Sequence, residues 1–405
     1  MSIDSERLSS SIQRLLDDAI AKGVAPGLAA TVFDQNDIVA SATAGKASLN
    51  LDSHEELVKV LPELGKGFPG SYVWKIVDGV DENGEYRYRE AKVGITLRHL
   101  LTHSMGSGFS FNSELGKRCH DEALKTGRTH LAGYIEAWNQ PREFEAGEGF
   151  AQVYGLSAEW LGLFVQRIGG QSFRRSAEEL VFKPLGLAPG TIETFRDAEM
   201  KARTAEIVAK LPDGTFISLP EPGFDVPNHK DEPPEGRSIL ANAPFWSSLR
   251  TFSQALRSLL NKTAPTRGGT GLISEELWQR ATADDYAKRG ISITQSPFMI
   301  SCDPTVSCHL EKWSEVEGGK DQSLGFAMFQ GVVHRSPNDV GFRPNVFEFS
   351  GLANTYYFLD FDRGIGAVIT AQFFPWGDPA MIALKNGFFQ MVFRAFEEEK
   401  RVNQK

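Results

Sequence analysis

The sequence predicts an α+β protein, an α/β sandwich in which a mostly antiparallel sheet from both termini is flanked by terminal helices. Three observations predict this fold class: β-rich segments lie near both ends, an amphipathic helix stands at each end, and the middle is mainly helical. The economical division places residues 1–48 and 323–405 in a sheet domain, with residues 49–322 as an inserted helical domain with long loops. A cleft between two such domains is the expected position of a site.

The N-terminal segment predicts a helix followed by a hairpin. Apolar residues recur at helical spacing from Leu8 to Ile20, and Gly23 with Pro26 ends the helix. Two apolar runs, 28–33 and 38–44, are joined by a short polar turn, which is typical of two antiparallel strands.

The middle of the chain is predicted to be mostly helical from residue 51 to about residue 260. Segments 96–102, 158–168 and 245–260 carry the helical pattern. Residues 211–238 are rich in Pro, Gly and charge, and we expect them to form a long surface excursion.

The C-terminal part returns to strands. Short β-rich segments at 323–333, 346–349, 354–360 and 366–372 are separated by Gly, Asp or Pro. A last amphipathic helix is expected over residues 379–399.

Composition narrows the function. The chain has 405 residues, of which 41% are hydrophobic and 23% charged, as in ordinary globular enzymes. With 43 Lys and Arg against 52 Asp and Glu, the net charge of −9 gives no global signal for binding nucleic acid or an anionic membrane. The three cysteines, no export signal and no long apolar run lead us to expect a cytoplasmic protein with reduced thiols.

Several motifs of catalysis and cofactor binding are absent from the sequence. It contains no G-x-S-x-G, no Walker A motif, no H-E-x-x-H and no G-x-G-x-x-G leading into a helix. Cys119-His120-Asp121, and Cys302 with Cys308-His309, lack the paired spacing that tetrahedral zinc requires. We therefore predict no metal and no cofactor.

Four segments in order resemble one known superfamily. They read ITLRHLLTHSMGSG at 95–108, FEAGEGFAQVYGLSAEWLG at 144–162, VFKPLG at 181–186 and FSGLANTYYFLD at 349–360. Together they resemble the serine β-lactamase-like superfamily, which includes class C β-lactamases, penicillin-binding proteins, related esterases and transesterases that acylate polyketide-type natural products. The resemblance implies chemistry through an acylated serine, with the nucleophile and a lysine in an S-x-x-K motif.

The resemblance also implies roles for residues near Tyr154. Tyr154 matches the tyrosine that shares proton transfer with the motif lysine. Ser157, in Tyr154-Gly155-Leu156-Ser157, stands one place later than the third position of the family's tyrosine motif.

A second set of site residues comes from the strand motif. Phe349-Ser350-Gly351 matches the family's K-T-G-like strand, and the backbone N–H of Leu352 would be one oxyanion donor. Phe349 stands where Lys, His or Trp is common, and it has no charge with which to hold a substrate carboxylate. This departure favours an esterase or transesterase over a β-lactam hydrolase.

The nucleophile is the main departure from the family. No serine in the sequence is followed by a lysine three residues later, so the S-x-x-K motif is absent and the nucleophile unknown. The segment after Gly45 runs almost directly into 49–64, about 20–30 residues short of the family pattern at ordinary element lengths. Three explanations are open: a pseudoenzyme, a misspliced isoform or incomplete gene model, and a relocated nucleophile, for which Ser104 and Ser107 are candidates.

The functional hypothesis follows from the resemblance. It is an acyltransferase (transesterase) or ester hydrolase acting on a small-molecule ester or thioester in secondary metabolism, with this chain inactive or impaired. Expected partners are a small-molecule acyl donor and acceptor, with a carrier protein or another thioester as donor, and neither nucleic acid nor membrane. The alternative is a non-catalytic protein that binds a ligand or partner on the same fold.

Overall fold

A computed structural model describes most of the chain in two compact units, residues 1–56 and residues 57–405. Each unit is described by itself. The described residues are 5–22, 27–33, 38–45, 50–109, 114–148, 155–194, 196–219, 236–238, 241, 245–260, 275–290, 293–294, 320–321, 324–328 and 331–403.

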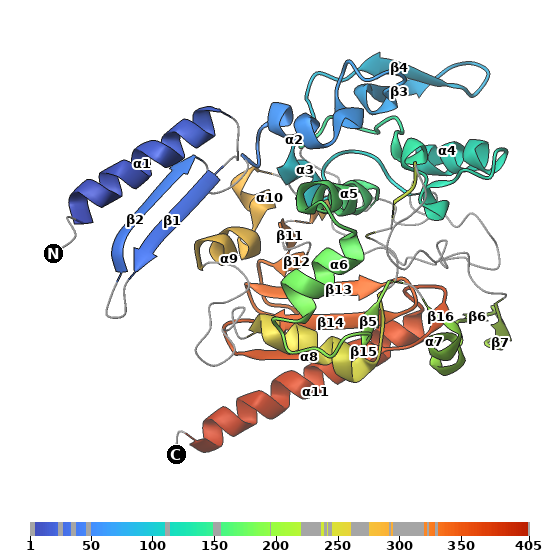
Figure 1. Cartoon of the computed structure of the whole chain (residues 1–405). Coiled ribbons are helices and arrows are strands. Elements are labelled where there is room, and N and C mark those ends of the chain that lie inside the picture. Colours follow the sequence, from blue (N-terminus) through green and yellow to red (C-terminus); the bar gives the residue numbers. More distant parts are fainter. Residues whose placement is uncertain are drawn as a thin grey trace. The chain divides into compact units, whose positions relative to one another are not determined.

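The first unit contains the predicted helix and hairpin. Helix α1 (Ser5–Ala21) packs on strands β1 (Gly27–Phe33) and β2 (Ile38–Gly45), which pair antiparallel (Figure 1). Leu16 and Ala42 are the buried centre of this small core. The structure thus confirms the predicted helix and hairpin, which could be predicted because their apolar periodicity is strong.

A five-stranded antiparallel sheet is the centre of the second unit. Its strands follow one another in chain order (Figure 1): β11 (Leu324–Ala327), β12 (Gly331–His334), β13 (Val346–Gly351), β14 (Thr355–Asp360) and β15 (Ile365–Thr370). The α+β fold class is thereby confirmed. The single strand predicted over 323–333 is wrong, since β11 and β12 are two strands that pair with each other.

Helices cover both faces of this sheet. Helix α11 (Pro379–Asn403) buries Phe389 and Phe393 against one face, in a cluster with Phe358 of β14. Helix α8 (Leu249–Leu260) packs Leu256 against Phe347 on the other face. Because side chains alternate along a strand, β13 presents neighbouring residues to different helices.

The remaining helices and strands of the second unit are short. The helices are α2 (His54–Val60, which begins in the first unit), α3 (Leu97–Leu101), α4 (Glu114–Leu124), α5 (Ser157–Gly169), α6 (Phe173–Ala177), α7 (Ala198–Arg203), α9 (Glu275–Thr282) and α10 (Asp285–Lys288). The strands are β3 (Lys75–Val80), β4 (Tyr86–Glu90), β5 (Ile192–Glu193), β6 (Val208–Lys210), β7 (Phe216–Ser218), β8 (Trp246–Ser247), β9 (Ile293–Thr294), β10 (Lys320–Asp321) and β16 (Phe373–Phe374).

Three details differ from the sequence expectations. The hairpin β3–β4 lies in a region predicted to be helical. The helix expected at 245–260 begins only at Leu249, after the two-residue strand β8. Within the expected excursion 211–238, β7 pairs with β6, and residues 220–235 lie outside the described part of the chain.

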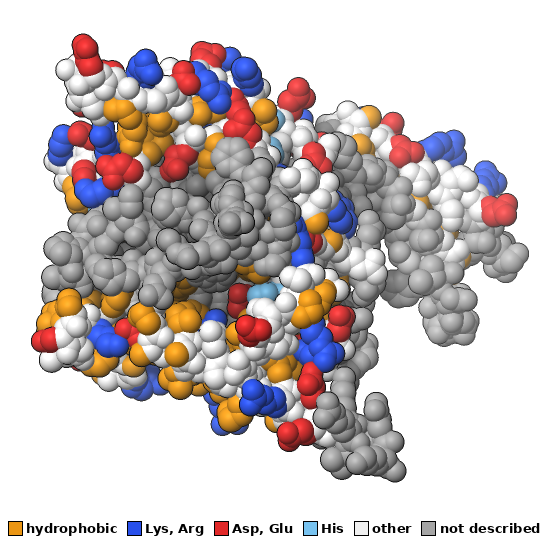
Figure 2. Space-filling view, turned by 180° about the vertical axis from the view of Figure 1, so that it is seen from behind, with side chains coloured by type: hydrophobic (Ala, Val, Ile, Leu, Met, Phe, Trp, Pro, Cys, Tyr) orange, Lys and Arg blue, Asp and Glu red, His pale blue; other side chains and the backbone are white. Residues whose placement is uncertain are grey.

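The division of the chain into a sheet domain and an inserted helical domain stays a prediction, because the two units are described separately. None of the helices that the structure describes is both long and apolar enough to span a bilayer. On the face in Figure 2, acidic and basic side chains are interspersed among the described residues. That mixture agrees with the modest net charge of −9.

Candidate active site

The predicted site residues divide between two places in the second unit. Tyr154 lies outside the described residues. Ser157 begins helix α5 and is fully buried, and its Oγ has no hydrogen-bond partner among the described residues. Gly155 forms an isolated antiparallel bridge with Gly108, and a Cβ at Gly155 would lie 2.3 Å from the Ser107 carbonyl oxygen. Only glycine fits at position 155.

The segment that meets Gly155 is a buried turn, defined here as residues 102–108, and every one of its residues is buried. It follows α3, whose first turn is closed by a capping box: the Thr96 hydroxyl accepts from the His99 N–H, and His99 Nδ1 accepts from the Thr96 N–H. The buried turn then leaves the helix through His103, whose φ of 49° is in the left-handed region. Backbone groups without a helical partner therefore lie in the interior and need other partners.

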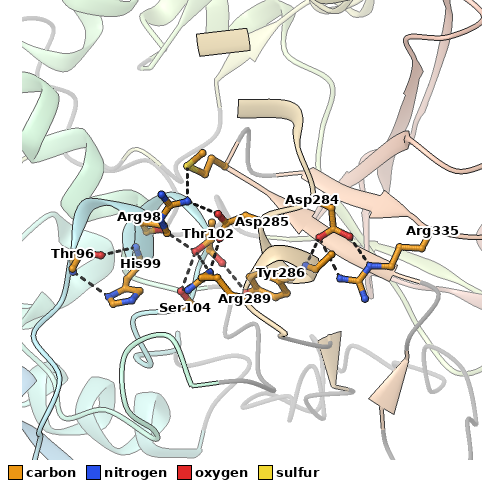
Figure 3. A network of polar contacts seen from close by, with 12 residues as sticks. Thr96, Arg98, His99, Thr102, Ser104, Asp284, Asp285, Tyr286, Arg289 and Arg335 are labelled. Atoms are coloured by element: carbon orange, nitrogen blue, oxygen red, sulfur yellow. Dashed lines mark hydrogen bonds and ion pairs between the residues drawn. The ribbon is translucent and has the colours of Figure 1, made fainter. Parts of the chain in front are cut away.

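Helix α10 supplies some of these partners (Figure 3). The Tyr286 hydroxyl donates to the Thr102 carbonyl oxygen at 2.8 Å, and Arg289 Nη2 donates to Thr102 Oγ1 at 3.0 Å. Thr102 Oγ1 and Ser104 Oγ are 2.9 Å apart. Tyr286 lies 184 positions after Thr102 in the sequence, so this is a long-range tie.

One buried carboxylate organises the charges of this network. Asp285 is bound by Arg98 at 2.5 Å and by Arg289 at 2.7 Å, and its side chain is 2% exposed. The next residue back, Asp284, pairs with Arg335 at 2.5 Å (Figure 3). Asp285 thus joins α10 to α3 through Arg98 and also binds Arg289 at the C-terminal end of its own helix, so both arginines are ion-paired.

The two serines considered as relocated nucleophiles lie in the buried turn. Ser104 is fully buried beside Thr102, and Ser107 is 1% exposed, with its hydroxyl 3.5 Å from the Pro141 carbonyl oxygen. Burial of His103 lowers the pKa of its imidazole to about 3, so this neighbour is neutral at pH 7. Ligand access to either hydroxyl would require the buried turn to open.

The strand motif ends in a tight hairpin turn between β13 and β14. Gly351 pairs with Thr355, and the N–H of Asn354 donates to the Gly351 carbonyl oxygen at 3.0 Å. No hydrogen bond joins the Leu352 N–H to another described residue. We call residues 351–355 the oxyanion turn, after the role that the sequence predicts for Leu352.

Phe349 and Ser350 point to opposite faces of the sheet. Phe349 packs against a cluster that includes Tyr286 and Phe326. The Ser350 hydroxyl accepts from Trp376 Nε1 at 3.2 Å. Tyr286 therefore contacts both β13 and the buried turn, so α10 lies between the two predicted halves of the site.

Sequence reasoning missed the residues that make this connection. Asp285, Tyr286 and Arg289 lie outside the four motif segments, and Arg98 lies within the segment 95–108 without a predicted role. The i,i+4 spacing of Asp285 and Arg289 was the available signal, since opposite charges at that spacing pair on a helix.

Metal-binding groups are sparse in this region. Among the described residues, no three His, Cys, Asp or Glu side chains come together as a metal site requires. Burial raises the pKa of the Cys119 thiol to about 11, which keeps it protonated. Cys302, Cys308 and His309 lie outside the described residues.

The arrangement of the sheet and helices indicates the class of protein. An antiparallel sheet with its C-terminal helix on one face, and a helical region reached through β13, is typical of the α+β fold of β-lactamases and penicillin-binding proteins. Residues 73–387 match the family model described as Beta-lactamase. The chain belongs to the β-lactamase family.

Curated relatives match part of the chain. Acyltransferase calJ of Penicillium decumbens is 30% identical over 184 residues, which are 45% of this chain and 42% of that protein. Monacolin J acid methylbutanoyltransferase of Aspergillus terreus is 28% identical over 159 residues, 38% of this chain and 35% of that protein. Lovastatin esterase of Penicillium rubens is 25% identical over 166 residues, 41% of this chain and 40% of that protein. The matches thus span less than half the length of these relatives.

Solved structures match over almost the whole chain. A LovD6 mutant of simvastatin synthase from Aspergillus terreus has a TM-score of 0.61 at 19% identity, covering 95% of this chain and 94% of the other. The unliganded selenomethionyl form of that synthase gives 0.58 at 17% identity, covering 97% and 98%. At these identities the likeness concerns the fold alone.

Proposed function

We propose that this chain is an acyl-transfer member of the β-lactamase family that takes small-molecule esters or thioesters of secondary metabolism, and that its own turnover is impaired. In the proposed reaction a serine hydroxyl takes the acyl group and the ester or thioester donor leaves as its alcohol or thiol. An alcohol or water then takes the acyl group as a new ester or an acid, which frees the serine hydroxyl. The named relatives include a methylbutanoyltransferase and an esterase, which supports a short acyl group as the transferred unit.

The single observation that carries the proposal is the Leu352 amide. It follows the strand motif directly, and among the described residues it has no hydrogen-bond partner. An N–H in a tight turn that is not used by the fold is suited to donate to an acyl oxygen as negative charge develops on it. Tyr154 is the proposed proton-transfer group, on the evidence of its motif alone.

The impairment rests on the sequence and on burial. No serine and lysine form S-x-x-K anywhere in the 405 residues. The relocated candidates, Ser104 and Ser107, are both buried. Removing one member of a nucleophile–base unit already removes most of the rate, so a chain without either should turn over slowly.

The test is labelling of the purified full chain with a fluorophosphonate, followed by intact-mass measurement. We expect no adduct, together with a rise in melting temperature on adding a methylbutanoyl thioester, because binding to the folded state stabilises it. A single-serine adduct would contradict the impairment and identify the nucleophile. Absence of both labelling and stabilisation would contradict the acyl-ligand assignment.

The second candidate is a pseudoenzyme, and the lost S-x-x-K favours it. Genomic DNA between the codons for Lys46 and Asn50 separates it from an incomplete gene model. An in-frame stretch encoding S-x-x-K, restored to the protein, should produce fluorophosphonate labelling at that serine, with the Ser→Ala version as control. Genomic DNA without such a stretch would leave the binding protein as the better account. A carrier-protein donor and a cytoplasmic location are further parts of the proposal that rest on the sequence.

A further inference from the structure

We propose that Asn354 is a positioning residue, which holds the oxyanion turn in the one conformation that presents the Leu352 N–H to an acyl oxygen. The inference rests on the proposed function for the role of Leu352. It adds the residue that sets the direction of that amide, and it is carried by the contacts of Asn354 itself.

The backbone of Asn354 sets the shape of the turn. Leu352, Ala353 and Asn354 form a three-residue hairpin loop closed by the pair Gly351 and Thr355. The third residue of such a loop takes the left-handed conformation, and Asn354 has φ of 64°. Asparagine is among the few residues other than glycine that adopt this conformation readily. The Asn354 carbonyl oxygen also accepts from the Ala371 N–H at 3.1 Å, which ties the loop to the segment after β15.

The side chain of Asn354 is fully buried and uses its whole hydrogen-bonding capacity. Its Nδ2 donates to the carbonyl oxygens of Phe373 at 2.7 Å and Pro375 at 2.9 Å. Its Oδ1 accepts from the Tyr356 hydroxyl at 2.8 Å and the Gly377 N–H at 3.1 Å. An amide has two donors and two acceptor lone pairs, so this set matches asparagine and no other side chain of its size.

The segment that Asn354 binds is itself anchored. The Gln372 carbonyl oxygen accepts from the Val208 N–H at 3.0 Å, where β16 pairs with β6. Asp378 binds Lys210 at 2.7 Å and accepts from the Met381 N–H at 3.0 Å in the first turn of α11. Asn354 therefore fastens the loop to a support held by two other elements.

A second tie lies on the other side of Leu352. The Trp376 Nε1–H donates to the Ser350 hydroxyl, so the support contacts the strand just before the loop as well as its last residue. Leu352 stands between these two ties. Because both ends are fixed and its own N–H is unused by described residues, the direction of that N–H depends on the support rather than on Leu352.

Asn345 provides a matched control. It has φ of 68°, nearly that of Asn354, and its N–H donates to the His334 carbonyl oxygen at 2.9 Å. Its side chain is exposed. The variant N345A therefore imposes the same backbone penalty in the same sheet without removing a buried amide network. N354G, in contrast, keeps the left-handed backbone and removes only the side chain.

The experiment uses the full chain labelled with ¹⁵N-leucine and observed by amide NMR, with the Leu352 signal assigned from its loss in L352M. Wild type, N354A, N354G, N345A and W376F are compared without ligand and in a titration with sodium methylbutanoate. We expect the Leu352 signal of N354A and N354G to move without ligand and their methylbutanoate affinity to fall about tenfold, a loss of the size of one hydrogen bond. W376F should show a smaller change, and N345A should match wild type.

The outcomes separate the two proposals. An unmoved ligand-free Leu352 signal in both N354A and N354G would overturn the positioning role, whatever the ligand does. A moved signal in these variants but not in N345A, with no response of wild type to methylbutanoate, would support the positioning role and contradict the acyl-oxygen role of Leu352. If N354A does not fold, the Leu352 signals of N354G and W376F are compared with wild type in the same way.

Discussion

Two turns on the candidate site are held in opposite ways. The buried turn 102–108 is held from α10 by the Tyr286 hydroxyl and by Arg289, whose charge is balanced by Asp285. The oxyanion turn is fixed by the neutral amide of Asn354, which makes four side-chain hydrogen bonds at 2.7–3.1 Å. The contrast is between a turn held partly through a charged group with a buried counter-ion and a turn held by a neutral amide alone.

The two solutions differ in how they fail. A buried ion that loses its partner costs far more than the pair contributes, because the remaining charge stays desolvated. A neutral network loses hydrogen bonds one at a time, at about 1–3 kcal/mol for each buried group left without a partner. We therefore expect one substitution at the Asp285 ion pairs to destabilise the buried turn strongly. Single substitutions around Asn354 should each destabilise the oxyanion turn by a smaller amount.

The largest expected effect is that of D285N. It leaves Arg98 and Arg289 without their carboxylate, and we expect about 3 kcal/mol lower stability, the low end for broken buried pairs because both arginines keep about one-fifth of their side-chain exposure. The measurement is urea unfolding followed by tryptophan fluorescence. All seven tryptophans lie in the unit 57–405, so the signal reports that unit.

The control for D285N is D121N, which removes the partly exposed i,i+4 partner of Lys117. Such exposed pairs contribute about 0.3–0.5 kcal/mol. Equal losses for D285N and D121N would show that the buried turn does not depend on its ionic support.

Lowering the pH should destabilise the buried turn before it destabilises the oxyanion turn. His103 has a pKa of about 3 when folded and about 6.5 when unfolded, so below pH 6.5 the unfolded chain binds more protons than the folded chain. The free energy of unfolding therefore decreases as the pH is lowered. From pH 6 to pH 5 we expect a loss of about 1.2 kcal/mol for each such histidine, since the unfolded imidazole is already mostly protonated at pH 6. His130, whose pKa burial also lowers to about 3, contributes a similar loss.

The Asp378 carboxylate, in the segment that supports the oxyanion turn, titrates at lower pH. Burial opposes ionisation of Asp378, but its hydrogen bond from Lys210 outweighs this and holds the pKa of that carboxyl below its usual range.

The prediction for His103 is checked by measuring unfolding at pH 7, 6 and 5 for wild type and H103N, whose asparagine tolerates the same left-handed backbone. The variant should show a shallower slope than wild type over pH 5–6, with the remainder coming from His130 and His120, whose pKa values burial also lowers. An unchanged slope would mean that His103 is not the titrating group.

The smallest effects come from removing one hydroxyl on each side of the comparison. Y286F removes the donor to the Thr102 carbonyl oxygen, and we expect about 1 kcal/mol of destabilisation. Y356F removes a donor to Asn354, but Asn354 Oδ1 still accepts from the Gly377 N–H, so we expect about 0.5 kcal/mol. Urea unfolding of both variants checks the order, and a larger loss in Y356F would reverse the proposed contrast.

Much of the fold could be predicted from the sequence where the pattern is long. Helix α5 and the strands β13–β15 follow apolar periodicity and end at glycine or a turn. The hairpin β3–β4 was missed because Tyr86–Glu90 is short and largely exposed, with only two tyrosines alternating with charged residues and no buried apolar run. Helix α10 has four residues, too few for a period.

The site was predictable only in part, for a related reason. The segment 349–352 carries a motif, and the structure places it at a strand end and turn. The partners that fix it are distant in sequence: Asn354 reaches Phe373 and Gly377, and Tyr286 reaches Thr102. Such contacts depend on tertiary packing, which composition and spacing do not record.

Phe349 is a position of the strand motif whose side chain packs, partly buried, against the core. Its ring packs with Tyr286, Leu324, Phe326 and Val332, four apolar neighbours from three elements. Replacing Phe349 by lysine or histidine would place a polar group among those rings before it could meet any ligand. An engineer who wanted this scaffold to bind an anionic ligand through position 349 would need to redesign the packing of α10 and β11 first.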